Sequence, residues 1–173
     1  CNTPMPIGYY DDWVKAADEE TNHFNMMCDC LESHSSFYGA MPAHAGLWRA
    51  AEDTANDFLG RLAVVPMVLE ARGLDVTPGM IKIFEAAQDQ QVVDALNVIY
   101  SEEVAHVAYG SKWFHYLCGR NEIDPKPKFH ELVRKYFHGS LKPPFNEEKR
   151  AEAGIAPDVY WPLADEMPPP AMR

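Results

Sequence analysis

Glu20-Thr21-Asn22-His23 and Glu103-Val104-Ala105-His106 repeat one pattern, a glutamate followed three residues later by a histidine. Both copies lie in segments with the apolar periodicity of long helices. Residues three apart project from the same helix face, so each pair can bind one metal ion or two adjacent ions. Two such helices facing each other would bring two carboxylates and two imidazoles together. The pattern therefore predicts a carboxylate-bridged site for two metal ions.

The composition indicates a globular protein. The 173 residues are 47% hydrophobic and 24% charged, and the net charge is −11. Residues 1–120 carry 7 Lys and Arg against 17 Asp and Glu, which argues against a broad basic face for nucleic acid. No apolar run approaches the roughly 20 residues of a membrane span. Four cysteines without a C-x-x-C pair are typical of a reducing compartment. We therefore expect an intracellular, cytoplasmic protein, or a mitochondrial one in a eukaryote.

The apolar periodicity predicts an all-α fold. Long helices are expected over about 11–37, 48–72 and 90–118, and a short one over about 77–87. Gly73 is expected to cap the second long helix, and Pro66 should kink or widen it just before Glu70. The predicted inner stripe of the first helix is Trp13, Ala17, Glu20, Phe24, Met27 and Leu31. Residues 11–120 would thus form the helical domain.

Residues 121–173 differ from the preceding part of the chain in composition, and two short helices are expected near 129–137 and 146–153. Nine of the 14 prolines fall between Pro125 and Pro170, and residues 161–170 are predicted to form an extended arm. This part is interpreted as a Pro-rich C-terminal extension of the helical domain.

Glu70 is the remaining candidate ligand. It precedes Glu103 by 33 residues, and an antiparallel return would place the two carboxylates at one level. Glu52 shares its predicted stripe but lies about 27 Å away along the axis, too far to serve the same site. The same offset from Glu20 points upstream of Cys1. We therefore expect the first bundle helix to be missing from this chain, through truncation, processing or an unrecorded segment.

Other residues could support such a site. Glu102, Tyr109 and His44 are candidates for contacts behind the ligands. An alternative remains open, in which the glutamates and histidines form a buried polar network or a degenerate metal site that holds helices in register.

The chain resembles the ferritin-like family catalogued as domain of unknown function 455. The resemblance lies in Glu19-Glu20-x-x-His23-Phe24, Pro42-Ala43-His44-x-Gly46-Leu47-Trp48, Leu69-Glu70-Ala71-Arg72-Gly73, Glu103-x-x-His106 and Gly110-x-x-Trp113-Phe114. This family is distantly similar to the di-iron tRNA hydroxylase and to ferritin-like oxidases. The resemblance implies a four-helix bundle with two iron ions, or iron and manganese, on Glu20, His23, Glu70, Glu103 and His106. Glu102 stands where the family pattern leads us to expect Asp, which puts the hydrogen bonding behind the ligands in question.

Two functional hypotheses follow. The first is an O2-dependent di-iron oxidoreductase that acts on an unknown small molecule. The second is a non-catalytic scaffold subunit with an empty or vestigial site, in which a protein partner covers the face left by the missing helix. Neither nucleic acid nor a membrane is expected as a partner.

Overall fold

Helices joined by turns and loops make up residues 3–166, the part of the chain that this computed structural model describes. In chain order they are α1 (Ile7–Ser33), α2 (Gly46–Asp53), α3 (Phe58–Val64), the π-helix η1 (Val65–Glu70), α4 (Ala71–Ala86), α5 (Gln90–Arg120), α6 (Pro125–Tyr136), α7 (Glu147–Glu152) and α8 (Pro157–Glu166). No strand occurs in these residues, so the predicted all-α class is confirmed. None of these helices is both long and apolar enough to cross a membrane.

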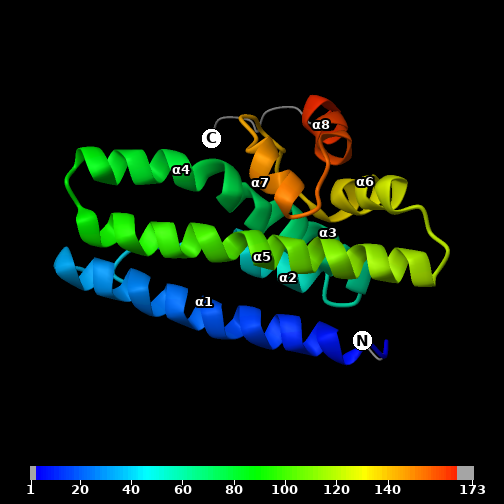
Figure 1. Cartoon of the computed structure of the whole chain (residues 1–173), viewed down its shortest axis with the longest axis horizontal. Helices are drawn as coiled ribbons and strands as arrows, with labels where there is room; N and C mark the ends of the chain where they lie inside the picture. Colours follow the sequence, from blue (N-terminus) through cyan, green and yellow to red (C-terminus); the bar gives the residue numbers. More distant parts are fainter. Residues whose placement is uncertain (1–2, 167–173) are drawn as a thin grey trace.

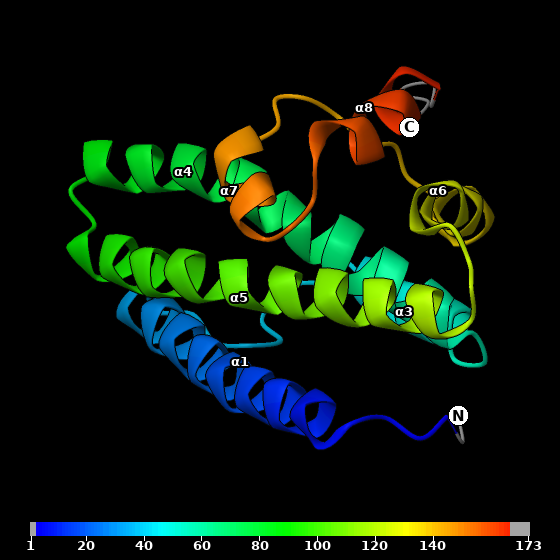
Figure 2. The same cartoon turned by 45° about the vertical axis from the view of Figure 1, so that its right-hand side comes forward.

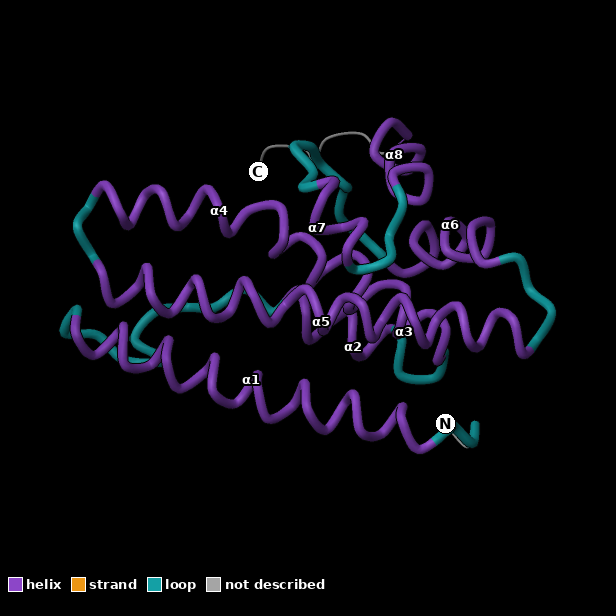
Figure 3. Tube along the Cα trace, viewed as in Figure 1, coloured by secondary structure: helices purple, strands orange, loops and turns teal. Residues whose placement is uncertain are grey.

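The long helix α5 lies at the centre of the fold. Figure 1 shows α1 on one side of α5 and α4 on the other, and the turned view in Figure 2 keeps this order. The short helices α6, α7 and α8 gather beyond α5 on the side away from α1, as the trace in Figure 3 also shows. In consequence, α5 contacts most of the other elements, whereas α1 packs chiefly against α5.

The predicted helix over 48–72 is interrupted. Thr54 ends α2, and the chain turns before Asp57 begins α3 by accepting a hydrogen bond from the backbone N–H of Gly60. Asp is a strong N-cap residue, and its cap chemistry outweighs the apolar periodicity at this point. Glu52, on the far side of the turn, is exposed.

The widening predicted at Pro66 is confirmed. Residues Val65–Glu70 form a π-helix, and proline at its start has no N–H to donate to the preceding turn. The Pro66 ring lies against Gly110 of α5, where no side chain separates the two helices. Glu70 is the last residue of this wide turn, so the irregular segment ends at a candidate ligand.

Two other predictions need correction. Gly73 does not cap a helix, because α4 continues through it and through Pro78 to Ala86. Residues 161–166 belong to α8 and are not extended, since Tyr160 and Leu163 bury this helix on the core. Residues 167–170 of the predicted arm lie outside the described part.

The predicted inner stripe of α1 is also wrong. The buried residues are Ala16, His23 and Cys30, whereas Phe24 is half exposed. The predicted stripe lies between the face packed on α5 and a second apolar face, which is exposed, so periodicity averaged the two.

The C-terminal segment is fastened to α4 by Arg150. Its guanidinium pairs with Asp75 at 2.7 Å, and both side chains are almost fully buried. The aromatic rings of Phe145 and Tyr160 lie 4.9 and 4.7 Å from the guanidinium carbon. The main apolar core accordingly runs from α3, η1, α4 and α5 into α6, the residues just after α7, and α8.

The close approach of α5 to η1 predicts that replacing glycine by alanine destabilises the protein at Gly110 but not at an open helical position. Gly110→Ala should lower the free energy of unfolding by about 1–3 kcal/mol, because the added methyl group would overlap the Pro66 ring. Gly79→Ala, in an open position of α4, should instead raise it by up to about 1 kcal/mol. Urea unfolding checks both variants, and equal effects would contradict the contact.

The buried ion pair predicts that removing one partner destabilises the protein more than replacing both. Asp75→Ala should destabilise the protein by about 3–5 kcal/mol, since it leaves the Arg150 charge buried without its partner. The double variant Asp75→Leu/Arg150→Met should recover most of this loss. A loss below 1 kcal/mol for Asp75→Ala would show that Arg150 does not hold the C-terminal segment.

Candidate metal centre

Polar pairs join α1 and α5 along their whole antiparallel crossing. Near the start of α1, Asp12 accepts hydrogen bonds from the Trp113 indole at 2.8 Å and from Lys112 at 2.7 Å. Near its end, His34 lies 2.9 Å from Asp89. Between these levels lie two histidine–glutamate contacts, Glu19 with His106 and His23 with Glu102. The crossing is thus set in register by directional contacts.

The two central contacts are reciprocal. His106 Nε2 lies 2.9 Å from Glu19 of α1, and His23 Nε2 lies 2.7 Å from Glu102 of α5. Glu19 immediately precedes Glu20, and Glu102 immediately precedes Glu103. Each histidine therefore contacts the residue just before the E-x-x-H motif of the opposite helix. The repeated unit is therefore E-E-x-x-H, and its two copies exchange hydrogen bonds across the interface.

This exchange determines which ring nitrogen is free. An ionised carboxylate can only accept, so Nε2 of each neutral histidine must donate and Nδ1 retains a lone pair. The Nδ1 atoms of His106 and His23 lie 3.1 and 3.3 Å from Oε1 of Glu20. They lie 3.8 and 3.9 Å from the carboxylate of Glu103. Both lone-pair nitrogens thus lie beside the same two carboxylates.

Glu70 of η1 adds a third carboxylate. We call Glu20, His23, Glu70, Glu103 and His106 the carboxylate–histidine cluster. Three of its polar atoms are buried without a hydrogen-bond partner among residues 3–166: Nδ1 of His23, Oε2 of Glu70 and Oε2 of Glu103. A buried polar atom left unpaired costs about 1–3 kcal/mol, and more if charged. A bound cation would satisfy all three.

The electrostatics of the cluster reflect crowding of like charges. Burial, with the charge of Glu20 adding to it, raises the pKa of Glu70 to about 7. Burial together with Glu20 and Glu70 raises the pKa of Glu103 to about 8. A hydrogen bond with His106 lowers the pKa of Glu20. Although burial opposes its charge, hydrogen bonds with Glu20 and Glu19 raise the pKa of His106 to about 9.

The structure brings most of the predicted site residues together. Ligand atoms of Glu20, Glu103 and His106 lie within 4.8 Å of one another, which is close enough to hold a metal ion. Glu102 contacts His23, and the ring of Tyr109 lies 6.4 Å from that of His106. The departure from the family pattern at Glu102 thus leaves a carboxylate in hydrogen-bonding position.

One candidate lies elsewhere, and one contributor was missed. His44 is exposed, and its Nδ1 accepts a hydrogen bond from the N–H of Gly46. It lines a cavity of about 370 Å³ with Arg49 and His138, and no described hydrogen bond or ion pair links it to the cluster. The sequence pattern alone assigns no role to Glu19, although the Glu-Glu doublet that begins both motifs points to it.

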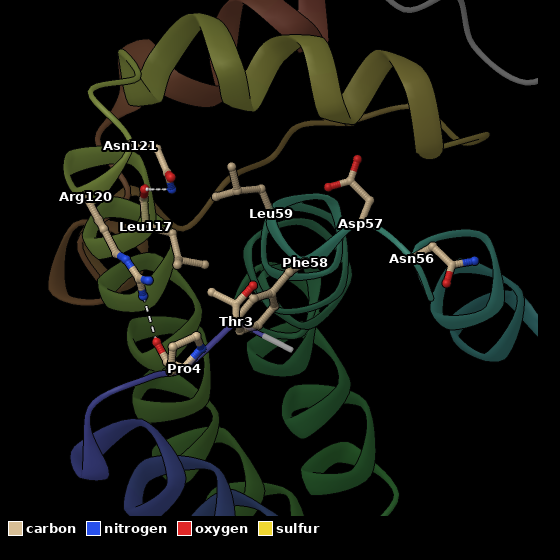
Figure 4. Close-up of a pocket in the computed structure, with 9 residues that line it drawn as sticks. All are labelled: Thr3, Pro4, Asn56, Asp57, Phe58, Leu59, Leu117, Arg120 and Asn121. Carbon is tan, nitrogen blue, oxygen red and sulfur yellow. Dashed lines mark hydrogen bonds between the residues drawn. The ribbon is translucent and has the colours of Figure 1, made fainter. Parts of the chain in front are cut away.

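Two hollows lie near α1. A groove of about 310 Å³ adjoins the cluster and is lined by Glu20, His23, Phe24, Met27, Cys28, Leu31 and Tyr38. A cavity of about 490 Å³ lies between the start of α3 and the end of α5, where Arg120 donates to the Pro4 carbonyl (Figure 4). This cavity shares no residue with the cluster, so the chemistry of the donors locates the candidate site better than cavity size.

Comparison with known proteins finds relatives without an assigned activity. Residues 2–161 match the family described as "Protein of unknown function (DUF455)". An "Uncharacterized protein" of Haemophilus influenzae is 38% identical over 149 residues, which cover 86% of this chain. The chain spans about half of that relative, since the matched region is 52% of its length. No solved structure matches.

The crowding of carboxylates predicts that neutralising Glu70 raises the free energy of unfolding, by an amount that depends on pH. Because its folded pKa of about 7 lies above the ordinary 4.5, ionisation opposes folding. This penalty is absent below pH 4.5, grows up to pH 7 and is then complete at roughly 3 kcal/mol. Glu70→Gln should therefore stabilise chelator-treated protein at pH 8 by up to this amount and have much less effect at pH 5. Urea unfolding at both pH values tests this, and equal effects would contradict it.

Proposed function

The chain belongs to the DUF455 family, whose function is unknown, and we propose from its cluster that it is a ferritin-like protein with two metal ions. The observation that carries the proposal is the set of buried potential ligand atoms on His23, Glu70 and Glu103 that have no hydrogen-bond partner among residues 3–166. Imidazole and carboxylate together suit iron and manganese. The two ions would be iron, or iron with manganese.

The residues have distinct roles in this proposal. Glu20 and Glu103, which lie beside both histidines, would be shared between the ions. His23 and His106 would each bind through Nδ1, and Glu70 would complete the set from the side of η1. Glu102 and Glu19 would orient the two rings and increase their basicity.

We further propose that the protein is an O2-dependent oxidoreductase acting on an unknown small molecule. Bound ferrous ions would supply the electrons with which O2 is reduced. The protein's part is to bind and shield them: His106 is almost fully buried, and Val104 and Val107 of α5 are buried on either side of it. Glu20 is about half exposed, so O2 and substrate would enter on its side.

Metal analysis tests the site. The purified chain, supplied with ferrous iron without oxygen and then desalted, should retain close to two ions. Glu103→Ala should retain less than one, whereas Glu52→Ala, which removes an exposed carboxylate near the end of α2, should bind like the unaltered protein. The iron-loaded chain should then consume O2, and Glu103→Ala should not. Less than one iron or manganese per chain, unchanged by Glu103→Ala, would end the proposal.

A second candidate function is a structural subunit whose cluster is vestigial. The observation in its favour is a row of exposed apolar side chains along α1, a surface that proteins usually cover. Under this alternative the chain would copurify with a partner and would contain little metal. Isolation as a monomer with full metal content would contradict it.

A further inference from the structure

Helix α1 has a second apolar face that is exposed within residues 3–166. Ile7, Val14 and Phe24 are 76%, 69% and 50% exposed. They belong to a row at alternating steps of three and four, which we call the α1 seam: Ile7, Tyr10, Val14, Ala17, Thr21, Phe24, Cys28 and Leu31. This is the spacing with which one helix packs along another. The α1 seam spans about 36 Å.

The α1 seam is separate from the face that packs on α5. Ala16, His23 and Cys30 define the buried face, and helix geometry turns the seam by about 140° from it. A helix in contact with a single neighbour needs only one apolar face. The sequence of α1 thus has the pattern of a helix with two helical neighbours, of which α5 is one.

The charges beside the α1 seam indicate what kind of helix would fit. Its outer edge carries Asp11, Asp18, Asp29 and Glu32, all exposed. The one lysine of α1, Lys15, lies 3.5 Å from Glu19. A second copy packed through the same seam would set acidic edge against acidic edge, and an anionic membrane surface would be repelled as well. A helix with Lys and Arg beside its apolar face would be attracted.

The inner edge of the α1 seam borders the carboxylate–histidine cluster. Glu20 lies on this edge with its side chain 51% exposed, whereas Glu103, His23 and His106 are 16% or less exposed. The groove of about 310 Å³ opens here, between Phe24 and His23, and Tyr38 stacks edge-on against Phe24. A helix on the seam would cover this groove and Glu20, and would close the cluster on its exposed side.

We propose that the α1 seam binds an amphipathic helix with a basic flank, of the kind that sequence equivalent to the unmatched half of the Haemophilus influenzae relative would supply. The Haemophilus influenzae relative has this additional sequence, since the matched region is only 52% of its length. The helix packs along α1 with its apolar face on Val14 and Phe24 and its Lys and Arg against Asp11 and Asp18. The inference concerns a packing surface and does not depend on metal binding.

The test uses fluorescent 30-residue peptides tiled across the unmatched half of the Haemophilus influenzae relative. Their binding to the 173-residue chain is measured by fluorescence anisotropy. At least one peptide with a basic flank should bind, and Val14→Asp should weaken its affinity at least 10-fold. Asp18→Lys should weaken it as well, more at low salt than at high salt.

Ile83→Asp is the matched control, because Ile83 is 66% exposed on α4, away from the α1 seam. It should leave the affinity unchanged, and circular dichroism should show that all variants remain folded. Failure of every peptide to bind would overturn the proposal. So would binding that is insensitive to Val14→Asp, or a dimer of the chain alone that Val14→Asp dissociates.

Discussion

The rest of the structure depends on burying acidic groups between α1 and α5. Glu103, His23 and His106 lie at this crossing, and Glu70 reaches it from η1. Desolvating carboxylates this close together costs several kcal/mol unless positive charge compensates them. Within the chain the compensation comes from His106, whose pKa is raised to about 9 by its hydrogen bonds with Glu20 and Glu19. A metal ion would replace this proton and also satisfy the unpaired atoms.

Several irregular features place donors around this centre. The turn before Asp57 redirects the chain after α2, and the π-helix at Pro66 ends at Glu70. Gly110 allows this wide turn to approach α5 closely, one helical turn after His106. The Arg150–Asp75 pair then holds the C-terminal segment over α4. The wide turn thus ends at a carboxylate whose charge, with that of Glu20, acts on Glu103.

Much of this arrangement could be predicted from the sequence, because ligand spacing is a local property. The three-residue step from Glu20 to His23 and from Glu103 to His106 follows from helix geometry, and the absent N–H of Pro66 predicts the widening. Periodicity failed on α1, where two apolar faces lie side by side and their average points between them. It failed again at Asp57, where a cap outweighs the apolar pattern, and at Gly73, where packing carries the helix onward.

The reciprocal hydrogen bonds lay beyond sequence reasoning, since they depend on the register of two helices 83 residues apart. The doublets Glu19-Glu20 and Glu102-Glu103 contained the information, but only the antiparallel crossing pairs each leading glutamate with the other helix's histidine. These bonds support the metal hypothesis more specifically than the motif does. They place Nδ1 of each histidine on the side of Glu20 and Glu103, where an ion would replace the Nδ1 proton of His106, and they orient both rings before any ion binds.

The most direct test is anomalous X-ray diffraction from iron-soaked crystals, with data collected on both sides of the iron absorption edge. The account predicts anomalous peaks bounded by Glu20, Glu70 and Glu103, with His23 and His106 bound through Nδ1 and still hydrogen-bonded through Nε2 to Glu102 and Glu19. Iron bound elsewhere, absent from the cluster, or coordinated through Nε2 would contradict it.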